Sequence, residues 1–213
     1  MENLSFFDTE DAVQPELDFS AQAKLDVVKM QLSEVQSLTW QELLSGFDTL
    51  HAITYSSGLG FVYELLELFE QTEIIFGSDE VISYSLQEVM AYQCKLVERI
   101  RDTASQRKLN LIEKIDRGAL RFYVARSALS HEKIYLHSAK DGRKRVVMGS
   151  ANMSYAAFGG YQRENICYLD DEQAYEWYWD CYCRLREECT DVIAKETLIC
   201  ADDGEHLEEL PIS

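Results

Sequence analysis

The chain has 213 residues, and 46% of them are hydrophobic, which is enough for one domain with a sizeable core. No run approaches the roughly 18 apolar residues that cross a bilayer, and the acidic N-terminus lacks the residue order of a secretory signal. These features exclude a long membrane-spanning helix, and we expect a cytoplasmic protein with no membrane partner.

The net charge of −18 is spread unevenly along the chain. Residues 118–165 carry eight Lys or Arg and three Asp or Glu, whereas the chain on either side is acidic. A basic stretch within an acidic body suits an anionic ligand. The same charges also suit the solvated tip of a hairpin, and composition does not decide between the two. The six cysteines lack CxxC spacing, so we expect reduced thiols and no metal site.

Charge and apolar patterning divide the chain into an acidic N-terminal arm with helices at 1–45, a folded domain at 46–200 and an acidic tail at 201–213. Apolar spacing and turn signals predict the elements of the first half in chain order. They are helices at 20–37 and 40–46, a strand at 51–56, a helix at 61–71, a strand at 72–76 and one long helix over 85–115. The short connections of the strand–helix–strand unit favour parallel strands.

The second half of the chain is richer in strands. Its predicted elements are strands at 120–125, 131–137, 145–148 and 164–169, then a helix at 172–189 with Tyr and Trp on its buried side. Asp141 and Gly142 form a hairpin turn signal between two of these strands. Helices that alternate with strands predict an α/β fold, and the hairpin makes the sheet mixed, with helices flanking it.

Four polar residues on the hairpin strands have the chemistry of a phosphate site. His131 and Lys133 are two residues apart and so share a face of the predicted strand. The return strand brings Ser150 and Asn152 toward them, and Gly149 lets the backbone approach a ligand. The histidine can attack phosphorus or move a proton, while the lysine and the amide stabilise charge on the phosphate oxygens. This chemistry needs no metal ion and no cofactor.

These residues resemble the HKD motif of the phospholipase D superfamily, with His-Glu-Lys at 131–133 and Gly-Ser-Ala-Asn at 149–152. The resemblance spans about residues 47–190, and it implies a phospholipase D-like catalytic domain. Glu164 resembles the acidic residue that orients the family's histidine. Ser138 stands where the family usually has aspartate, and this departure leaves open a catalytically inactive member.

The resemblance implies a metal-independent phosphodiesterase that forms a phosphohistidine intermediate. Family active sites join two motifs, and the HxK pattern occurs once in this chain. The resemblance therefore implies a homodimer with one shared site. A nuclease acting on nucleic acid is the favoured function, in DNA restriction or phage defence, with a partner or fused ATPase or helicase. The alternatives are an inactive module that dimerises and binds phosphate or a partner, and a phospholipid or small phosphodiester hydrolase.

Cations near the motif are predicted to contact the substrate. Phosphate groups of a nucleic acid are bound chiefly by Arg and Lys side chains. The predicted contacts are Arg126, Lys140, Arg143, Lys144 and Arg145.

Overall fold

The computed structural model describes residues 29, 34–78, 82–97, 99–125 and 129–190. The chain divides into Met1–Ser37 and Leu38–Ser213, and every element described below belongs to the second unit. The helix predicted at 20–37 lies almost wholly outside the described residues, and its described end, 34–37, is not helical. The acidic tail predicted at 201–213 lies outside them entirely.

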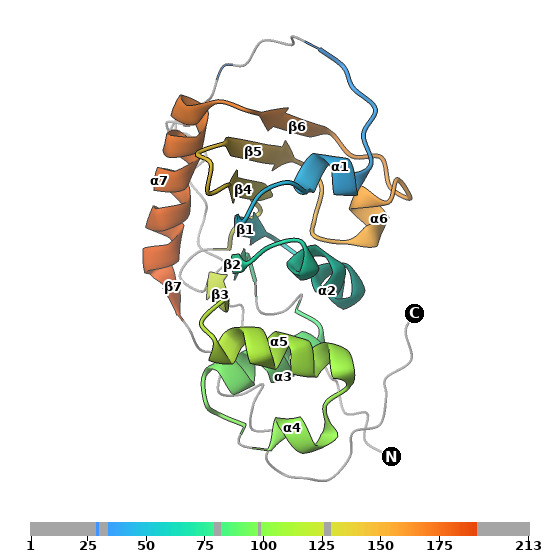
Figure 1. The fold of residues 1–213 in the computed structure, drawn as a ribbon, viewed down its shortest axis with the longest axis vertical. Helices are drawn as coiled ribbons and strands as arrows, with labels where there is room; N and C mark the ends of the chain where they lie inside the picture. Colours follow the sequence, from blue (N-terminus) through green and yellow to red (C-terminus); the bar gives the residue numbers. More distant parts are fainter. Residues whose placement is uncertain (1–28, 30–33, 79–81, 98, 126–128, 191–213) are drawn as a thin grey trace, which may run out of the picture. The chain divides into compact units, whose positions relative to one another are not determined.

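A mixed sheet of seven strands forms the centre of Leu38–Ser213 (Figure 1). The strands are β1 (Thr49–Thr54), β2 (Gln71–Phe76), β3 (Leu120–Ala125), β4 (Ile134–Ser138), β5 (Lys144–Gly149), β6 (Ile166–Leu169) and β7 (Cys189–Thr190). They lie in the order β6-β5-β4-β1-β2-β3-β7. The pairs β1–β2 and β2–β3 are parallel and the other four are antiparallel. The predicted α/β class, with a mixed sheet, is confirmed.

Helices cover both faces of the sheet. They are α1 (Trp40–Leu44), α2 (Leu59–Glu67), α3 (Tyr84–Gln93), α4 (Ile100–Thr103), α5 (Gln106–Asp116), α6 (Tyr155–Phe158) and α7 (Glu172–Glu188). Leucine and phenylalanine side chains from α1, α2, α3, α5 and α6 join one core cluster with residues of one sheet face. Tyrosines of α7 pack with residues of the other face, as the aromatic pattern of this helix predicted. The two layers are visible on either side of the strands in Figure 1.

The single long helix predicted over 85–115 is wrong. Three helices, α3, α4 and α5, occupy this stretch. The first of them stops at Gln93, and Lys95 has a positive φ of 59°, a left-handed conformation that ends helices. Ser105 then caps α5, because its hydroxyl accepts a hydrogen bond from the Lys108 backbone N–H at 3.5 Å. Apolar periodicity continues through all three helices, so the pattern alone conceals the breaks.

His137 lies fully buried on β4, between the rings of Phe47 and Phe69 at centroid distances of 5.4 and 5.6 Å. Backbone groups of Tyr135 and Arg145 lie near its ring nitrogens, but neither nitrogen has a hydrogen bond of normal geometry. Burial, and then the positive charge of Arg145, lower the pKa of His137 to about 3. The ring is therefore held neutral in the folded protein.

This buried histidine makes stability depend on pH. An unfolded histidine takes up a proton below about pH 6.5, whereas the folded one resists protonation until about pH 3. The contribution of His137 to the unfolding free energy is fully present above about pH 6.5, the pKa of histidine in the unfolded chain. It is lost as the pH falls toward the lower pKa of His137 in the folded protein. Between about pH 7 and about pH 5, we expect wild type to lose about 1–2 kcal/mol more unfolding free energy than His137→Leu. Urea unfolding at both pH values measures this, and equal losses would contradict it.

Candidate active site

The five residues predicted to be catalytic lie at one edge of the sheet, which is called the catalytic edge below. β1 and β5 end at this edge, while β4 and β6 begin there, because Ile134 pairs with both Ile53 and Met148. Gly149 pairs with Ile166, which places the start of β6 beside the end of β5. His131 and Lys133 therefore precede β4, Ser150 and Asn152 follow β5, and Glu164 precedes β6. In sheets of this kind, ligands bind beyond the carboxyl ends of the parallel strands.

His131 and Lys133 do not lie on a strand, which corrects the strand predicted at 131–137. They belong to the segment before β4, and the His131 ring is stacked on the ring of Tyr55. The centroids are 4.1 Å apart and the ring planes differ by 14°. The Lys133 Nζ donates to the His131 carbonyl at 2.5 Å and lies 5.6 Å from the centre of the Tyr55 ring. Tyr55 thus contacts both members of the motif.

Gly77, the residue that follows β2, holds the backbone just before His131 in place. The Ser130 backbone N–H donates to the Gly77 carbonyl at 3.1 Å. A Cβ on Gly77 would stand 1.8 Å from the Ser130 carbonyl oxygen, so no larger residue fits without movement. The Ser130 hydroxyl also bonds to the carboxylate of Glu132 at 3.1 Å. These contacts set the direction in which the His131 backbone leaves the loop.

Gly149 and Ser150 join the end of β5 to the segment that holds Glu164. Gly149 has a φ of +148°, and a Cβ there would stand 1.8 Å from the Asn165 carbonyl oxygen. The Ser150 hydroxyl donates to the Glu164 carboxylate and accepts from the Asn165 backbone N–H at 2.9 Å. Glu164 makes no hydrogen bond to His131 in this single chain, both residues being described. Its role in orienting the histidine stays a prediction.

Asn152 links the segments that follow β1 and β5. Its side-chain oxygen accepts from the Ser56 backbone N–H at 3.3 Å, which leaves the amide NH2 group as a donor. The following residue, Met153, donates its N–H to the Thr54 hydroxyl at 3.1 Å. Thr54, Tyr55 and Ser56 were missed as site residues. The signal for them was their position at the carboxyl end of a parallel strand and directly after it, because such positions line ligand sites.

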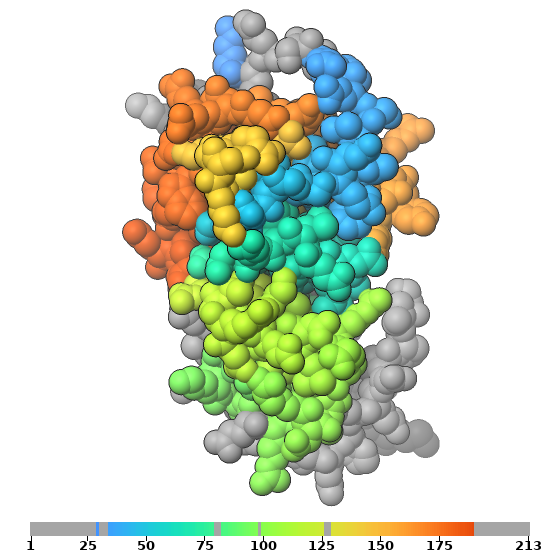
Figure 2. Space-filling model, in the orientation of Figure 1, coloured from blue at the N-terminus to red at the C-terminus, as the bar shows by residue number. Residues whose placement is uncertain are grey.

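The cations predicted to bind substrate are not brought together with His131. Arg126 lies outside the described residues. The other four belong to the β4–β5 hairpin, the gold surface in Figure 2, at the end of the strands away from the catalytic edge. Five residues of β4 span roughly 15 Å. Each cation there is paired: Lys140 with Glu70, Arg143 with Asp141, Lys144 with Glu172 and Glu176, and Arg145 with Asp170. Their contact with substrate stays a prediction.

Ser138, which replaces the usual aspartate of the motif, lies at the same distant end of β4. It pairs with Thr49 on β1 and with Lys144 on β5. Its side chain lies beside the hydroxyl of Tyr175 on α7. The departure therefore falls on a structural position, away from His131.

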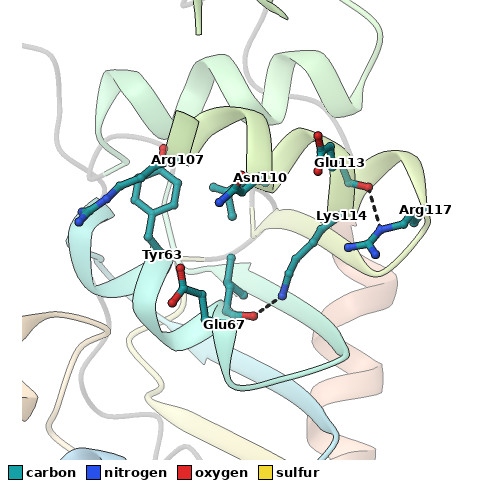
Figure 3. A pocket seen from close by; sticks show the side chains of 9 residues that line it. Tyr63, Glu67, Arg107, Asn110, Glu113, Lys114 and Arg117 are labelled. Carbon is teal, nitrogen blue, oxygen red and sulfur yellow. Dashed lines mark hydrogen bonds between the residues drawn. The ribbon is translucent and has the colours of Figure 1, made fainter. Parts of the chain in front are cut away.

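A pocket of about 210 Å³ lies elsewhere, between α2 and α5 (Figure 3). Tyr63, Glu67, Arg107 and Lys114 are among its lining residues. The Lys114 ammonium donates to the carbonyls of Leu66 and Phe69, so it caps the end of α2 and is not available to a ligand. This lysine serves the packing of α5 against α2.

Two further features of the described residues bear on function. No three His, Cys, Asp or Glu side chains gather there as metal ligands. None of the helices in these residues is both long enough and apolar enough to cross a membrane.

Comparison with known proteins gives a family for this chain. Residues 40–195 match the NgoFVII restriction endonuclease N-terminal PLD domain. Three solved structures are similar. NucT from Helicobacter pylori is 15% identical, with 69% of this chain and 84% of that chain covered and a TM-score of 0.43. A phospholipase D family member, Nuc from Salmonella typhimurium, is 13% identical over 72% and 91%, with a TM-score of 0.40. Yeast tyrosyl-DNA phosphodiesterase is 12% identical over 57% and 25%, with a TM-score of 0.38. No curated protein matches the chain.

Proposed function

The chain belongs to the phospholipase D superfamily, and on that premise we propose that it cleaves nucleic acid through His131. Membership of the restriction endonuclease PLD family makes it a nuclease or phosphodiesterase domain. One observation carries the finer proposal: an exposed His131 lies beside Lys133 at the edge that also holds Ser150 and Asn152. The family is named for a restriction endonuclease, which supports DNA as the first substrate to test and restriction as the setting.

The proposed reaction has two steps and needs no metal ion. The His131 imidazole attacks phosphorus and forms a phosphohistidine, while a second histidine gives a proton to the leaving oxygen. That second histidine then activates a water molecule, which releases the phosphate and restores His131. Lys133 and the Asn152 amide donate to the phosphate oxygens and stabilise their charge in the transition state.

The second histidine comes from a second copy of the chain. The motif occurs once, and a two-fold axis beside the catalytic edge would bring two His131 rings to one phosphate. The exposure of His131 in the single chain supports this arrangement. Equilibrium sedimentation at micromolar concentration is expected to show a dimer. A strict monomer that still cleaves substrate would contradict the shared site.

Cleavage assays on a panel of substrates in EDTA test the proposed function. Plasmid, single-stranded DNA, RNA and phospholipid vesicles are incubated with the protein, and products are resolved for each. We expect cleavage of at least one nucleic acid at the same rate with and without EDTA. Cleavage that requires magnesium contradicts the proposal, hydrolysis of lipid alone supports the phospholipid alternative, and cleavage of no substrate supports an inactive binding module.

Tyr55 is expected to position the catalytic pair, because its ring contacts both His131 and Lys133. Replacing Tyr55 by leucine removes the stacking surface, and we expect kcat to fall by about ten- to a hundredfold with KM little changed. Tyr55→Phe keeps the ring and should keep at least half of wild-type kcat. Steady-state kinetics of both variants measure this. Equal losses in the two variants would show that the hydroxyl, and not the ring, matters.

A further inference from the structure

The short loop that joins α6 to β6 lies at the catalytic edge and presents an aromatic ring and a cation beside Glu164. The loop is tied to α6, because the Gln162 N–H donates to the Ala156 carbonyl at 2.8 Å. Arg163 in this loop directly precedes Glu164, which accepts the hydrogen bond of Ser150. The loop is therefore held beside the hydrogen bond between Ser150 and Glu164.

Tyr161 in this loop is the most exposed of the large hydrophobic side chains in the described residues, at 85%. Its ring lies over the backbone of Gly159, since a Cβ there would stand 3.1 and 3.3 Å from two ring carbons. One side of the ring thus contacts the backbone of Gly159, and the rest of the ring is open to solvent. Core packing does not account for a ring in this position, because it buries almost nothing.

Arg163 is exposed and makes no ion pair with any residue that the structure describes. The hairpin cations differ from it, since each has a carboxylate partner. Lys133 and Arg163 therefore offer positive charge at the catalytic edge, and neither is in an ion pair within the described part of the chain. A phosphate near His131 would meet these two cations before any on the hairpin.

We propose that Tyr161 and Arg163 form a subsite for an unpaired nucleotide next to the phosphate that is cleaved. The Tyr161 ring stacks on the nucleobase and the Arg163 guanidinium binds the adjoining phosphate. Tyr161 and Glu164 are three positions apart in the chain, a reach of at most about 10 Å, so both can lie beside one bound segment of a strand. This subsite rests on the proposed nuclease function and specifies its substrate as a strand with unstacked bases.

The charge of the chain favours an unpaired substrate. A net charge of −18 opposes the purely electrostatic binding on which duplex affinity depends. Base stacking on an aromatic ring adds affinity that does not depend on net charge. A nucleobase can use this contribution only when its face is free.

Binding to labelled oligonucleotides tests the subsite, in proteins that also carry His131→Ala so that no cleavage occurs. Fluorescence anisotropy compares single-stranded DNA, single-stranded RNA, an abasic strand of equal length and a blunt DNA duplex. Tyr161→Ala should weaken binding to at least one single strand about tenfold or more, whereas Tyr161→Trp should retain it. Affinity for the abasic strand and the duplex should change less than about twofold. Arg163→Ala should lower the salt slope by about 0.7.

Two controls separate these effects from general damage. Trp177→Leu removes an aromatic that is 40% exposed on α7, and Arg117→Ala removes a cation at the opposite edge of the sheet, before β3. Neither should alter binding. The subsite is overturned if Tyr161→Ala binds single strands as tightly as its parent, loses affinity for the abasic strand equally, or no longer sediments as the parent does, since Tyr161 would then be a dimer contact.

Failure of the subsite is distinguishable from failure of the function. Wild-type protein that cleaves DNA or RNA, together with a Tyr161→Ala variant that cleaves at the same rate, keeps the nuclease and removes the subsite. Wild-type protein that cleaves nothing, together with the predicted loss of binding, removes the nuclease and keeps a site for unpaired nucleotides.

Discussion

Replacing His131 by alanine is expected to lower the rate of phosphodiester cleavage by about 10³-fold or more, since each dimer loses both its nucleophile and its proton donor. The side chain is exposed, so the substitution should leave the folded structure intact. Single-turnover cleavage under excess protein measures the chemical step directly. Thermal unfolding of the same preparation should agree with wild type within about 2 °C.

Lys140→Ala is the matched comparison for His131→Ala. The charge pattern predicts that Lys140 contacts substrate, but the structure pairs it with Glu70 at 2.5 Å at the far end of the hairpin. We expect its single-turnover rate to stay within about twofold of wild type, because exposed ion pairs contribute little. A His131→Ala variant that retains a tenth of wild-type activity would exclude His131 as the nucleophile. A large loss in Lys140→Ala would restore the hairpin as a substrate contact.

Gly77→Ala is expected to reduce the cleavage rate about a hundredfold although Gly77 touches no substrate. Its new Cβ would stand 1.8 Å from the Ser130 carbonyl oxygen, so the chain before His131 must move. Displacement of a catalytic group by about 1 Å can cost about 10²-fold in rate. The unfolding free energy should fall by about 1–3 kcal/mol, which is small enough to leave the protein folded.

Gly60→Ala provides the control for this glycine. Gly60 lies within α2, and a Cβ there would meet only the Tyr155 ring at an ordinary 3.5 Å. Alanine should leave activity unchanged and stabilise the helix by about 1 kcal/mol. Kinetic assays measure the cleavage rate of both variants, and urea unfolding measures their unfolding free energy. Wild-type activity in Gly77→Ala would show that the close approach to Ser130 does not position His131.

Much of the fold is predictable because it depends on local patterns. Alternating strands and helices, the Asp141-Gly142 turn and the aromatic stripe of α7 each leave a short-range signal that the structure confirms. The break after α3 has no such signal, since the left-handed residue is Lys95 and not glycine. The start of β4 is also misplaced by sequence alone. Its preceding residues alternate as a strand would, but contacts with Tyr55 and Gly77 hold them in a loop.

The candidate site, like the fold, is only partly predictable from the sequence. The motif residues could be named from the chain because their spacing is local, whereas their surroundings depend on residues far along the sequence. Tyr55 lies 76 positions before His131, and nothing in either segment indicates that the rings stack. The hairpin cations suggested a substrate contact because their partners, such as Glu70 and Asp170, are distant in sequence. A count of charges along the sequence does not reveal ion pairs between residues that only the fold brings together.

The claim that the chain carries half of an active site is tested most directly with mixed dimers. Wild-type and His131→Ala chains with different tags are co-expressed, and dimers that contain one of each are purified through both tags. If two His131 side chains serve one phosphate, mixed dimers in EDTA should cleave at less than about a tenth of the wild-type rate, because they lack either nucleophile or proton donor. Mixed dimers with half of the wild-type rate would show that each chain holds a complete site, and would contradict the account.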